Sequence, residues 1–366
     1  MLLHCSASSA VHFWSKQENR IIKSRWRIQS PRSPLVRRFL VVVLVLVLVA
    51  LALAYRDLEK PATPPAETIV EVVPGMGTRA IGALLAQHGI IRSQYTFDAW
   101  HVVRRGTLKA GEYQFVQPAT LPSVYNRIVR GDVYTRTVTI PEGYNLFEIA
   151  QAVEDAQLGS KASFLAAASQ DVSLIADLDP KAKSLEGYLF PDTYRFPRRL
   201  TPEQLLAAMV RRFRQNSASI GLDGDYHRVV TLASLVEKET PVAADRPLVA
   251  SVLENRLAKE MPLMTDPTVI YAALLENRYR GTIYQSDLKR DSAYNTYRHT
   301  GLPPGPICSP GTASLQAAMH PADSHFLYFV ADPAAAGHSR FASTLQEHER
   351  NVTAYRQGLK DLQGAH

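Results

Sequence analysis

The stretch Arg-Val-Val-Thr-Leu-Ala-Ser-Leu-Val-Glu-Lys-Glu-Thr, residues 228–240, joins an apolar helical run to two carboxylates separated by one lysine. Its apolar spacing predicts an amphipathic helix, and steps of three and four residues from Val236 and Leu235 reach Glu239. We therefore expect Glu239 on the buried face. Glu237 is turned roughly 200° away from it at about 100° per residue, so we expect Glu237 to be less enclosed. Pro241 ends the helix, which places Glu239 beside a loop.

A carboxyl group on an apolar helix face either pairs with a cation or has its pKa raised by desolvation. In the second case the group is a general acid that is still protonated near neutral pH. The alternative is that Glu239 belongs to an ordinary solvated last turn. The pattern thus makes Glu239 the candidate catalytic residue.

The chain has 366 residues, 46% of them hydrophobic, which is enough for two domains with substantial cores. Its formal charge is +7. Residues 1–38 hold eight Lys and Arg residues against the single acid Glu18, so this basic arm carries the whole excess. The charge therefore does not indicate a nucleic-acid partner.

Residues 39–55 form an uncharged run of mainly Val and Leu that is just long enough to cross a bilayer as one helix. The basic arm before it predicts a cytoplasmic N-terminus, with everything from Arg56 onward outside. A signal peptide cleaved near Ala54 is the alternative. Cys5 and Cys308 would lie on opposite sides of the membrane, so we expect no disulfide between them. Residues 56–66 contain three prolines and indicate a stiff linker.

Residues 67–135 alternate short strands and helices: a strand at 68–73, helices around 81–85, 95–104 and 121–129, and a strand at 111–115. Short strands flanking helices resemble a LysM-like wall-binding module. The alternative is that this segment is the first half of one larger domain.

Residues 136–360 are predicted to form a mixed α/β catalytic domain, so the fold class is α+β. Capping boxes open helices at Asn145 and Thr201, and further helices are expected at 246–259, 269–275, 313–319 and 341–357. Residues 326–331 have the pattern of a buried strand.

Two loops, 184–194 and 292–297, combine tyrosines with acids and amides, as a sugar-binding groove requires, since aromatic faces stack on sugars and carboxylates accept from hydroxyls. The alternative is that their aromatic side chains fill the core. The candidate substrate-binding residues, from these loops and from neighbouring motifs, are Glu186, Tyr188, Asp192, Tyr194, Glu237, Asp266, Tyr294, Asn295 and Tyr297.

Other chemistries fit the sequence poorly. Ser286 to Lys289 matches the Ser-x-x-Lys element of penicillin-binding serine enzymes, but no apolar helix follows the serine. The C-terminal histidines lack the spacing of a catalytic zinc site, and no glycine-rich phosphate loop precedes a helix. We expect neither metal nor cofactor.

Six ordered motifs together resemble the endolytic murein transglycosylases, the YceG-like family. They are Glu186-Gly-Tyr-Leu-Phe-Pro-Asp-Thr-Tyr194, Ala233-Ser-Leu-Val-Glu-Lys-Glu-Thr240, Thr265-Asp-Pro-Thr-Val-Ile-Tyr271, Tyr294-Asn-Thr-Tyr297, Gly301-Leu-Pro-Pro-Gly-Pro306 and His320-Pro321. The resemblance implies that the second glutamate of Glu-Lys-Glu, here Glu239, is catalytic. The basic arm is longer than the family pattern suggests.

The resemblance further implies a single-pass inner-membrane protein with a periplasmic catalytic domain and a LysM-like module. Its substrate would be nascent peptidoglycan strands, cut between MurNAc and GlcNAc without water to give 1,6-anhydroMurNAc ends and so limit strand length. Peptidoglycan synthases, the penicillin-binding proteins, are implied partners. A muramidase using Glu186, Asp192 or Asp266 as second carboxylate, or a non-catalytic wall-binding scaffold, are the alternatives.

Overall fold

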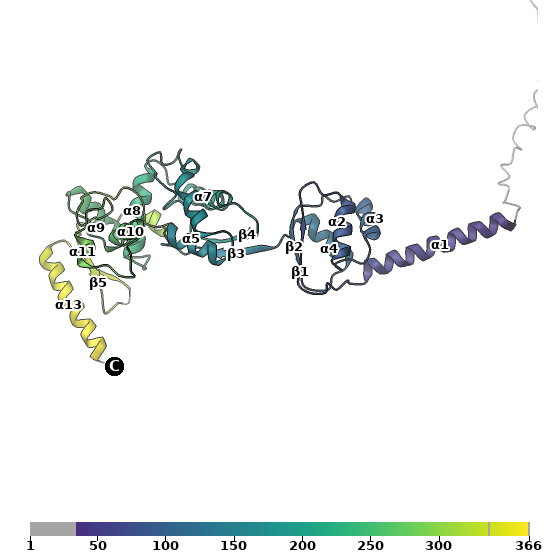
Figure 1. The fold of residues 1–366 in the computed structure, drawn as a ribbon. Coiled ribbons are helices and arrows are strands. Elements are labelled where there is room, and N and C mark those ends of the chain that lie inside the picture. Colours follow the sequence, from purple (N-terminus) through teal and green to yellow (C-terminus); the bar gives the residue numbers. More distant parts are fainter. Residues whose placement is uncertain (1–33, 336, 365–366) are drawn as a thin grey trace, which may run out of the picture. The chain divides into compact units, whose positions relative to one another are not determined.

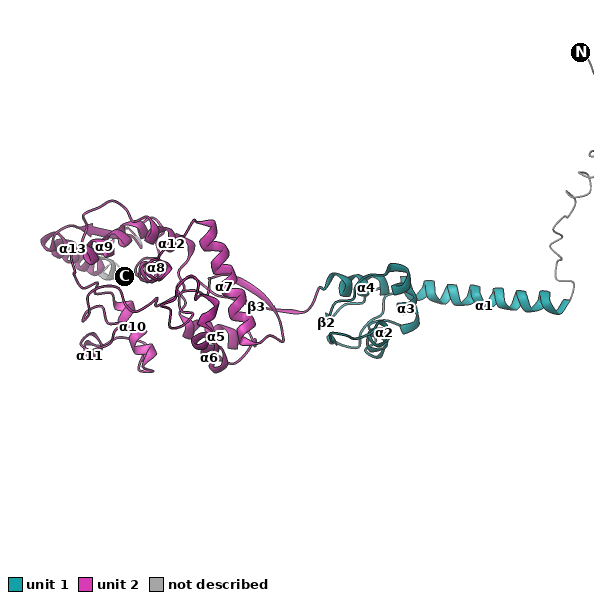
Figure 2. Ribbon diagram, turned by 90° about the horizontal axis from the view of Figure 1, so that it is seen from above, with its two compact units in different colours: residues 1–110, 114–131 teal, residues 111–113, 132–366 magenta. Residues whose placement is uncertain are grey.

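The computed structural model describes residues 34–335 and 337–364 (Figure 1). Residues 1–33 of the basic arm, including Cys5, lie outside the described residues. The chain divides into two compact units, residues 1–110 with 114–131 and residues 111–113 with 132–366 (Figure 2). The predicted mixture of α and β structure is confirmed.

The first described element is α1 (Pro34–Glu59), an apolar helix without buried residues. At 1.5 Å per residue its 26 residues span about 39 Å, more than the roughly 30 Å of a bilayer core. It is the one helix among the described residues that is long and apolar enough to cross a membrane. The helix extends the predicted span of 39–55 at both ends.

The rest of unit 1 is a small module in which two strands pair and three helices pack. Its elements are β1 (Thr68–Val72), α2 (Thr78–Gln87), α3 (Gln94–Arg104), β2 (Gly111–Phe115) and α4 (Leu121–Arg130). Ser93 caps α3 by accepting from the Thr96 N–H, and Gly131 ends α4 in the left-handed conformation. The core side chains include Phe97 and Tyr125, both fully buried.

Unit 2 opens with an antiparallel ribbon of β3 (Thr135–Thr139) and β4 (Thr193–Pro197), in which Thr135 pairs with Pro197. Between these strands lie α5 (Leu146–Asp155), α6 (Lys161–Gln170) and a short 3₁₀ turn (Val172–Leu174). The helix α7 (Pro202–Ser219) follows. Both predicted capping boxes, at Asn145 and Thr201, are confirmed.

The centre of unit 2 is α8 (Tyr226–Glu239), against which α9 (Arg246–Ala258), α10 (Asp266–Leu275) and α12 (Thr312–Met319) pack. A short helix, α11 (Gln285–Leu288), lies in the loop after α10. Residues Val230 to Val236 of α8 are buried without interruption. The middle of the helix is therefore enclosed on all sides, whereas its sequence had predicted an amphipathic helix with one buried face.

The C-terminal part of unit 2 differs from the prediction. The strand β5 (Tyr328–Ala331) pairs antiparallel with β6 (Ser339–Ala342), and α13 (Leu345–Gly364) covers this hairpin. The residues of β5 are half-buried or exposed, so the prediction of a buried strand is wrong. β5 contacts both α13 and α9, and its Phe329 packs only partly buried against the core.

Candidate active site

The last turn of α8 presents two glutamates in different surroundings. Glu237 is bound on both oxygens: Oε1 lies 3.0 Å from Nη2 of Arg246, and Oε2 accepts from the Gly311 N–H at 3.0 Å. Its side chain is only 6% exposed. Glu237, which we expected to be the less enclosed of the two glutamates, is thus itself well covered by Arg246 and Gly311.

The Glu237 pair belongs to a larger charge cluster. Arg246, the first residue of α9, also approaches Oε2 of Glu142 at 3.7 Å. Burial and the charge of Glu237 raise the pKa of Glu142, and Arg246 opposes this shift. A Cβ at Gly311 would lie 1.9 Å from the Glu142 carboxylate, so glycine leaves room for that side chain. This cluster joins the end of α8 to the start of α9.

Glu239 is half-buried and stands alone. Among the described residues its carboxyl group has neither a hydrogen bond nor an ion pair. Burial, followed by the charge of Asp266, raises its pKa to about 7, whereas the charge of Arg256 acts in the opposite direction. A carboxyl group with this pKa is partly protonated at neutral pH and can both donate and accept a proton.

Three side chains interact electrostatically with the Glu239 carboxyl group: Asp266, Tyr297 and Arg256. Asp266, the first residue of α10, is exposed and accepts a hydrogen bond from the Tyr297 hydroxyl at 2.6 Å. The Arg256 guanidinium donates to the carbonyl oxygens of Leu327 at 2.7 Å and Leu263 at 2.8 Å. These carbonyls fix Arg256, so its positive charge stays near the Glu239 carboxylate when the proton leaves.

The first predicted sugar-binding loop is largely interior. Tyr188 is fully buried, and its hydroxyl donates to Oδ2 of Asp179 at 2.6 Å. The prediction that Tyr188 lines a groove is wrong, because its ring packs on Phe213 and its one polar atom is already bonded. Here the alternative, aromatic side chains that fill the core, is what the structure shows.

The other members of that loop also have protein partners. Glu186 is 2% exposed, and its Oε2 accepts from the Leu146 N–H at 3.0 Å. Burial raises its pKa to about 7 against hydrogen bonds from Leu146 and Tyr271. Asp192 pairs with Arg212 at 2.6 Å, and the Tyr194 hydroxyl donates to the Phe190 carbonyl oxygen.

The residues of the second predicted sugar-binding loop, 292–297, lie in two different surroundings. Tyr297 lies beside Asp266 and Glu239, as its altered pKa reflects: burial and the bond to Asp266 raise it. The ring of Tyr294 lies 5.0 Å from that of Tyr271. Asn295 is buried, and its amide holds the loop by donating to the carbonyl of Arg290 at 2.7 Å and to its neighbours, which contradicts a direct sugar contact.

Three residues that the sequence analysis did not select contribute to the site: Arg246, Arg256 and Tyr271. Arg246 carried a usable signal, because a cation at the first position of a helix opposes the helix dipole and suggests a carboxylate partner. Tyr271 ends one of the six family motifs but was not selected, and Arg256 had no signal, since its neighbours come from distant parts of the chain.

A cavity of about 530 Å³ lies between α5, the start of α6 and α10, with the end of α8 in its wall. Its lining residues are Asn145, Phe147, Glu148, Gln151, Lys161, Lys238, Pro267, Ile270, Tyr271, Leu274, Tyr279 and Ile307. Lys238 directly precedes Glu239, and Pro267 directly follows Asp266. The cavity and the Glu239 carboxyl group therefore both lie near the end of α8 and the start of α10.

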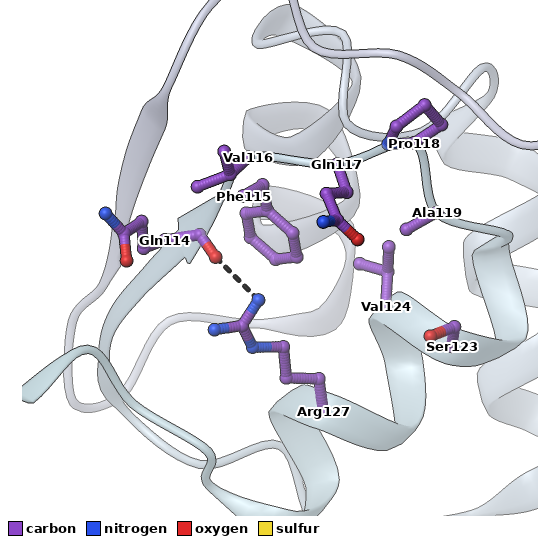
Figure 3. Close-up of a pocket in the computed structure, with 9 residues that line it drawn as sticks. All are labelled: Gln114, Phe115, Val116, Gln117, Pro118, Ala119, Ser123, Val124 and Arg127. Atoms are coloured by element: carbon purple, nitrogen blue, oxygen red, sulfur yellow. Dashed lines mark hydrogen bonds between the residues drawn. The ribbon is translucent and has the colours of Figure 1, made fainter.

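Unit 1 contains a separate pocket of about 360 Å³ between β2 and α4 (Figure 3). Figure 3 shows Arg127 reaching from α4 toward the Phe115 ring, with its Nη1 donating to the Gln114 carbonyl oxygen at 2.6 Å. The guanidinium lies 5.1 Å from the ring centroid. The amide of Gln117 and the hydroxyl of Ser123 also line this pocket.

No group of three or more His, Cys, Asp and Glu side chains converges on a possible metal position within residues 34–335 and 337–364. Cys308 is buried and forms no disulfide. What the described residues offer for chemistry is a half-buried carboxyl group without a partner at the end of a helix.

The described residues thus define a mixed α and β protein with one apolar N-terminal helix and, at the end of α8, a carboxyl group of raised pKa, that of Glu239. The profile of the YceG-like family matches residues 70–354, and the chain belongs to this family.

Individual relatives agree with this assignment. The endolytic murein transglycosylase of Bacillus subtilis is 33% identical over 331 residues, which cover 82% of this chain and 88% of the relative. The protein of the same name from Streptococcus pneumoniae D39 is 31% identical over 78% of this chain, which spans 58% of that longer relative. The crystal structure of a YceG-like protein from Listeria monocytogenes matches with a TM-score of 0.51 at 33% identity. It covers 78% of this chain and 98% of its own.

Proposed function

We propose that this chain is an endolytic murein transglycosylase that cuts peptidoglycan glycan strands with Glu239 as its single acid and base. Two observations support the activity: membership of the YceG-like family and relatives that bear this name. The observation that carries the assignment of Glu239 is its solitary carboxyl group, whose pKa burial raises to about 7.

The proposed reaction proceeds in two proton transfers without water. The protonated Glu239 carboxyl first gives its proton to the oxygen that links MurNAc C1 to GlcNAc, and the C1–O bond breaks. The Glu239 carboxylate then takes the proton of the C6 hydroxyl of the same MurNAc, and O6 bonds to C1. The products are a 1,6-anhydroMurNAc end and a free GlcNAc hydroxyl, so every atom and proton is accounted for.

The surroundings of Glu239 suit both halves of this cycle. Burial favours the protonated acid before bond cleavage. The fixed charge of Arg256 favours the carboxylate that remains afterwards. The Asp266 carboxylate and the Tyr297 hydroxyl are placed to receive sugar hydroxyl groups, and we retain both as substrate-binding residues.

A muramidase would need a second carboxylate as nucleophile or base. Of the three candidates, Glu186 is 2% exposed and bonded to the Leu146 N–H, and Asp192 is paired with Arg212. Asp266 is exposed and near Glu239, so hydrolysis through Asp266 is the competing reaction. An anhydro end is lighter than a hydrolysed end by one water, so product mass separates the two.

The test is digestion of uncrosslinked glycan strands by the full chain in detergent, followed by mass analysis of the ends. We expect anhydro ends from wild type and a loss of about 10²- to 10⁴-fold in Glu239→Gln, the usual contribution of a positioned acid and base. Glu237→Gln should keep a measurable part of the activity. Reducing ends would favour the hydrolase. The absence of all turnover would favour a scaffold.

The remaining parts of the proposal concern location and partners. The apolar α1 supports anchoring in the inner membrane with unit 2 in the periplasm, where cleavage would limit the length of new strands. Two strands flanking two helices support a LysM-like role for unit 1. The Phe115 ring in its pocket already stacks on Arg127, so sugar binding there would rely on Gln117 and Ser123 (Figure 3). Peptidoglycan synthases are the proposed partners.

A further inference from the structure

The cavity beside α8 is lined by side chains that have no role in the proposed cleavage reaction. Two of its lining residues are lysines, Lys161 at the start of α6 and Lys238 at the end of α8. Neither forms an ion pair with a described residue. Lys161 donates to the Gln151 amide oxygen and Lys238 to the Gly143 carbonyl oxygen, both at 3.2 Å. Each ammonium group therefore keeps two N–H donors for a ligand.

The one carboxylate in the lining, Glu148, is already engaged. Its Oε2 accepts from the Asn145 N–H at 2.9 Å as half of the capping box that opens α5. It also lies at a helix N-terminus, where the dipole compensates negative charge. The two lysines thus leave the cavity with a net positive charge.

Helix stability does not explain Lys161. As the first residue of α6 it opposes the helix dipole, which disfavours cations at that end. The lining also includes the apolar side chains of Phe147, Pro267, Ile270 and Leu274. At about 530 Å³ the cavity has the size of ordinary small-ligand sites, which measure roughly 300–1,000 Å³.

We propose that this cavity binds the peptide stem of the MurNAc residue that is being cleaved, with Lys161 and Lys238 receiving the free carboxylate of the second stem residue. The inference rests on the proposed function, because it takes the MurNAc at Glu239 as its starting point. The stem leaves MurNAc through a lactyl group and an alanine, whose methyl groups suit the apolar part of the lining. Two extended residues span about 7 Å, comparable with the reach of a lysine side chain.

The position of the cavity favours a stem over an unrelated anion. Lys238 and Glu239 are consecutive residues whose Cα atoms lie about 3.8 Å apart, and their side chains diverge by about 100°. One sugar can therefore meet Glu239 while its substituent enters the cavity.

The test compares three uncrosslinked substrates: strands with stems that carry a free glutamate carboxylate, strands in which that group is amidated, and strands without stems. The quantity of interest is the ratio of kcat/KM for the free-acid strands to that for each of the others. Wild type should prefer the free acid about tenfold, as expected for one charge-assisted hydrogen bond. Lys161→Gln should bring this ratio close to one, and the matched control Lys183→Gln, an exposed lysine outside the cavity lining, should retain it.

A binding measurement without turnover completes the test. Calorimetry of the full chain in detergent with N-acetylmuramyl-L-alanyl-D-glutamate, and with its amide, should show about tenfold weaker binding of the amide, a difference lost in Lys161→Gln. Equal affinities for acid and amide in wild type, or an unchanged preference in Lys161→Gln, would overturn the stem site even if cleavage proceeds. Glycan that is bound with this preference but not cut would instead overturn the proposed transglycosylase activity alone.

Discussion

At the scale of single residues, the site depends on the difference between two neighbouring carboxyl groups. Glu237 binds a buried arginine and a backbone N–H, whereas Glu239 has neither. A carboxylate that already has a cation partner is a poor proton donor, and a desolvated carboxyl group without one is a good proton donor. The same element thus supplies Glu237, which binds within the protein, and Glu239, which we propose as the acid and base.

The raised pKa of Glu239 makes activity dependent on pH. Because the proposed reaction begins with protonated Glu239, kcat/KM should fall as the pH rises through about 7, well above the ordinary 4.5 of glutamate. Rates on uncrosslinked strands between pH 5 and 9 would measure this fall, the alkaline limb of the pH profile. Glu186 has a pKa of about 7 as well, so Glu186→Gln is the control and should keep the limb. A limb that disappears in Glu186→Gln would assign the titration to Glu186.

The same shift has a consequence for stability. The folded-state pKa of Glu239 lies above its unfolded value. Its stabilising contribution to the free energy of unfolding is therefore complete below about pH 4.5 and is lost as the pH rises through about 7. Glutamine mimics the protonated form and does not titrate. The free energy of unfolding should therefore decline less over this range in Glu239→Gln than in wild type.

At the scale of elements, the middle of α8 is buried among α9, α10 and α12. The sequence predicted the helix itself but not these neighbours. Helix boundaries followed from caps such as Asn145 and Thr201, whose bonds are local. The strands β4 and β6 were missed, because β4 pairs with a partner on the far side of α5 and α6 and its five residues show little pattern of their own. The role of Tyr188 was missed for the same reason, since Asp179 and Phe213 complete its surroundings.

One close approach between a loop and α8 gives a stability prediction. Gly187 has φ +85°, and a Cβ there would lie 2.5 Å from Pro306 and 2.9 Å from Val230 of α8. Gly187→Ala should destabilise unit 2 by about 3 kcal/mol or more, from backbone strain and overpacking together. Gly221→Ala has a similar φ of +71° but open space, so it should cost only about 1–2 kcal/mol. Urea unfolding followed by circular dichroism would compare them, and equal losses would contradict the packing argument.

The charge cluster between α8 and α9 gives a second prediction. Arg246 is 8% exposed and serves both Glu237 and Glu142, so Arg246→Met would leave two neighbouring carboxylates without their cation. A loss of about 3–5 kcal/mol in unfolding free energy is expected. The control is Arg228→Gln, which removes the more exposed pair with Glu254 and should cost no more than about 1 kcal/mol. Similar unfolding midpoints for both variants would mean that the buried cluster is not needed for stability.

At the scale of the whole molecule, membrane topology decides whether unit 2 can meet its proposed substrate. Eight basic residues and one acid precede the apolar run, whereas Arg56, Asp57, Glu59 and Lys60 just after it balance in charge. Loops rich in Lys and Arg stay in the cytoplasm, so we propose that the N-terminus faces inward and the rest of the chain outward. A wall-cleaving unit on the cytoplasmic side would never contact glycan strands.

Reporter fusions test this orientation directly. Alkaline phosphatase needs disulfides that form outside the cytoplasm, so a fusion after residue 366 should be active. A fusion after residue 38, before the uncharged run 39–55, should be inactive and serves as the matched control. Replacing the basic residues of the arm by glutamine while adding lysines after Lys60 should reduce the activity of the long fusion, because the charge bias would then be reversed. An inactive long fusion that is fully expressed would place unit 2 in the cytoplasm and remove the physical basis for cleavage of the wall.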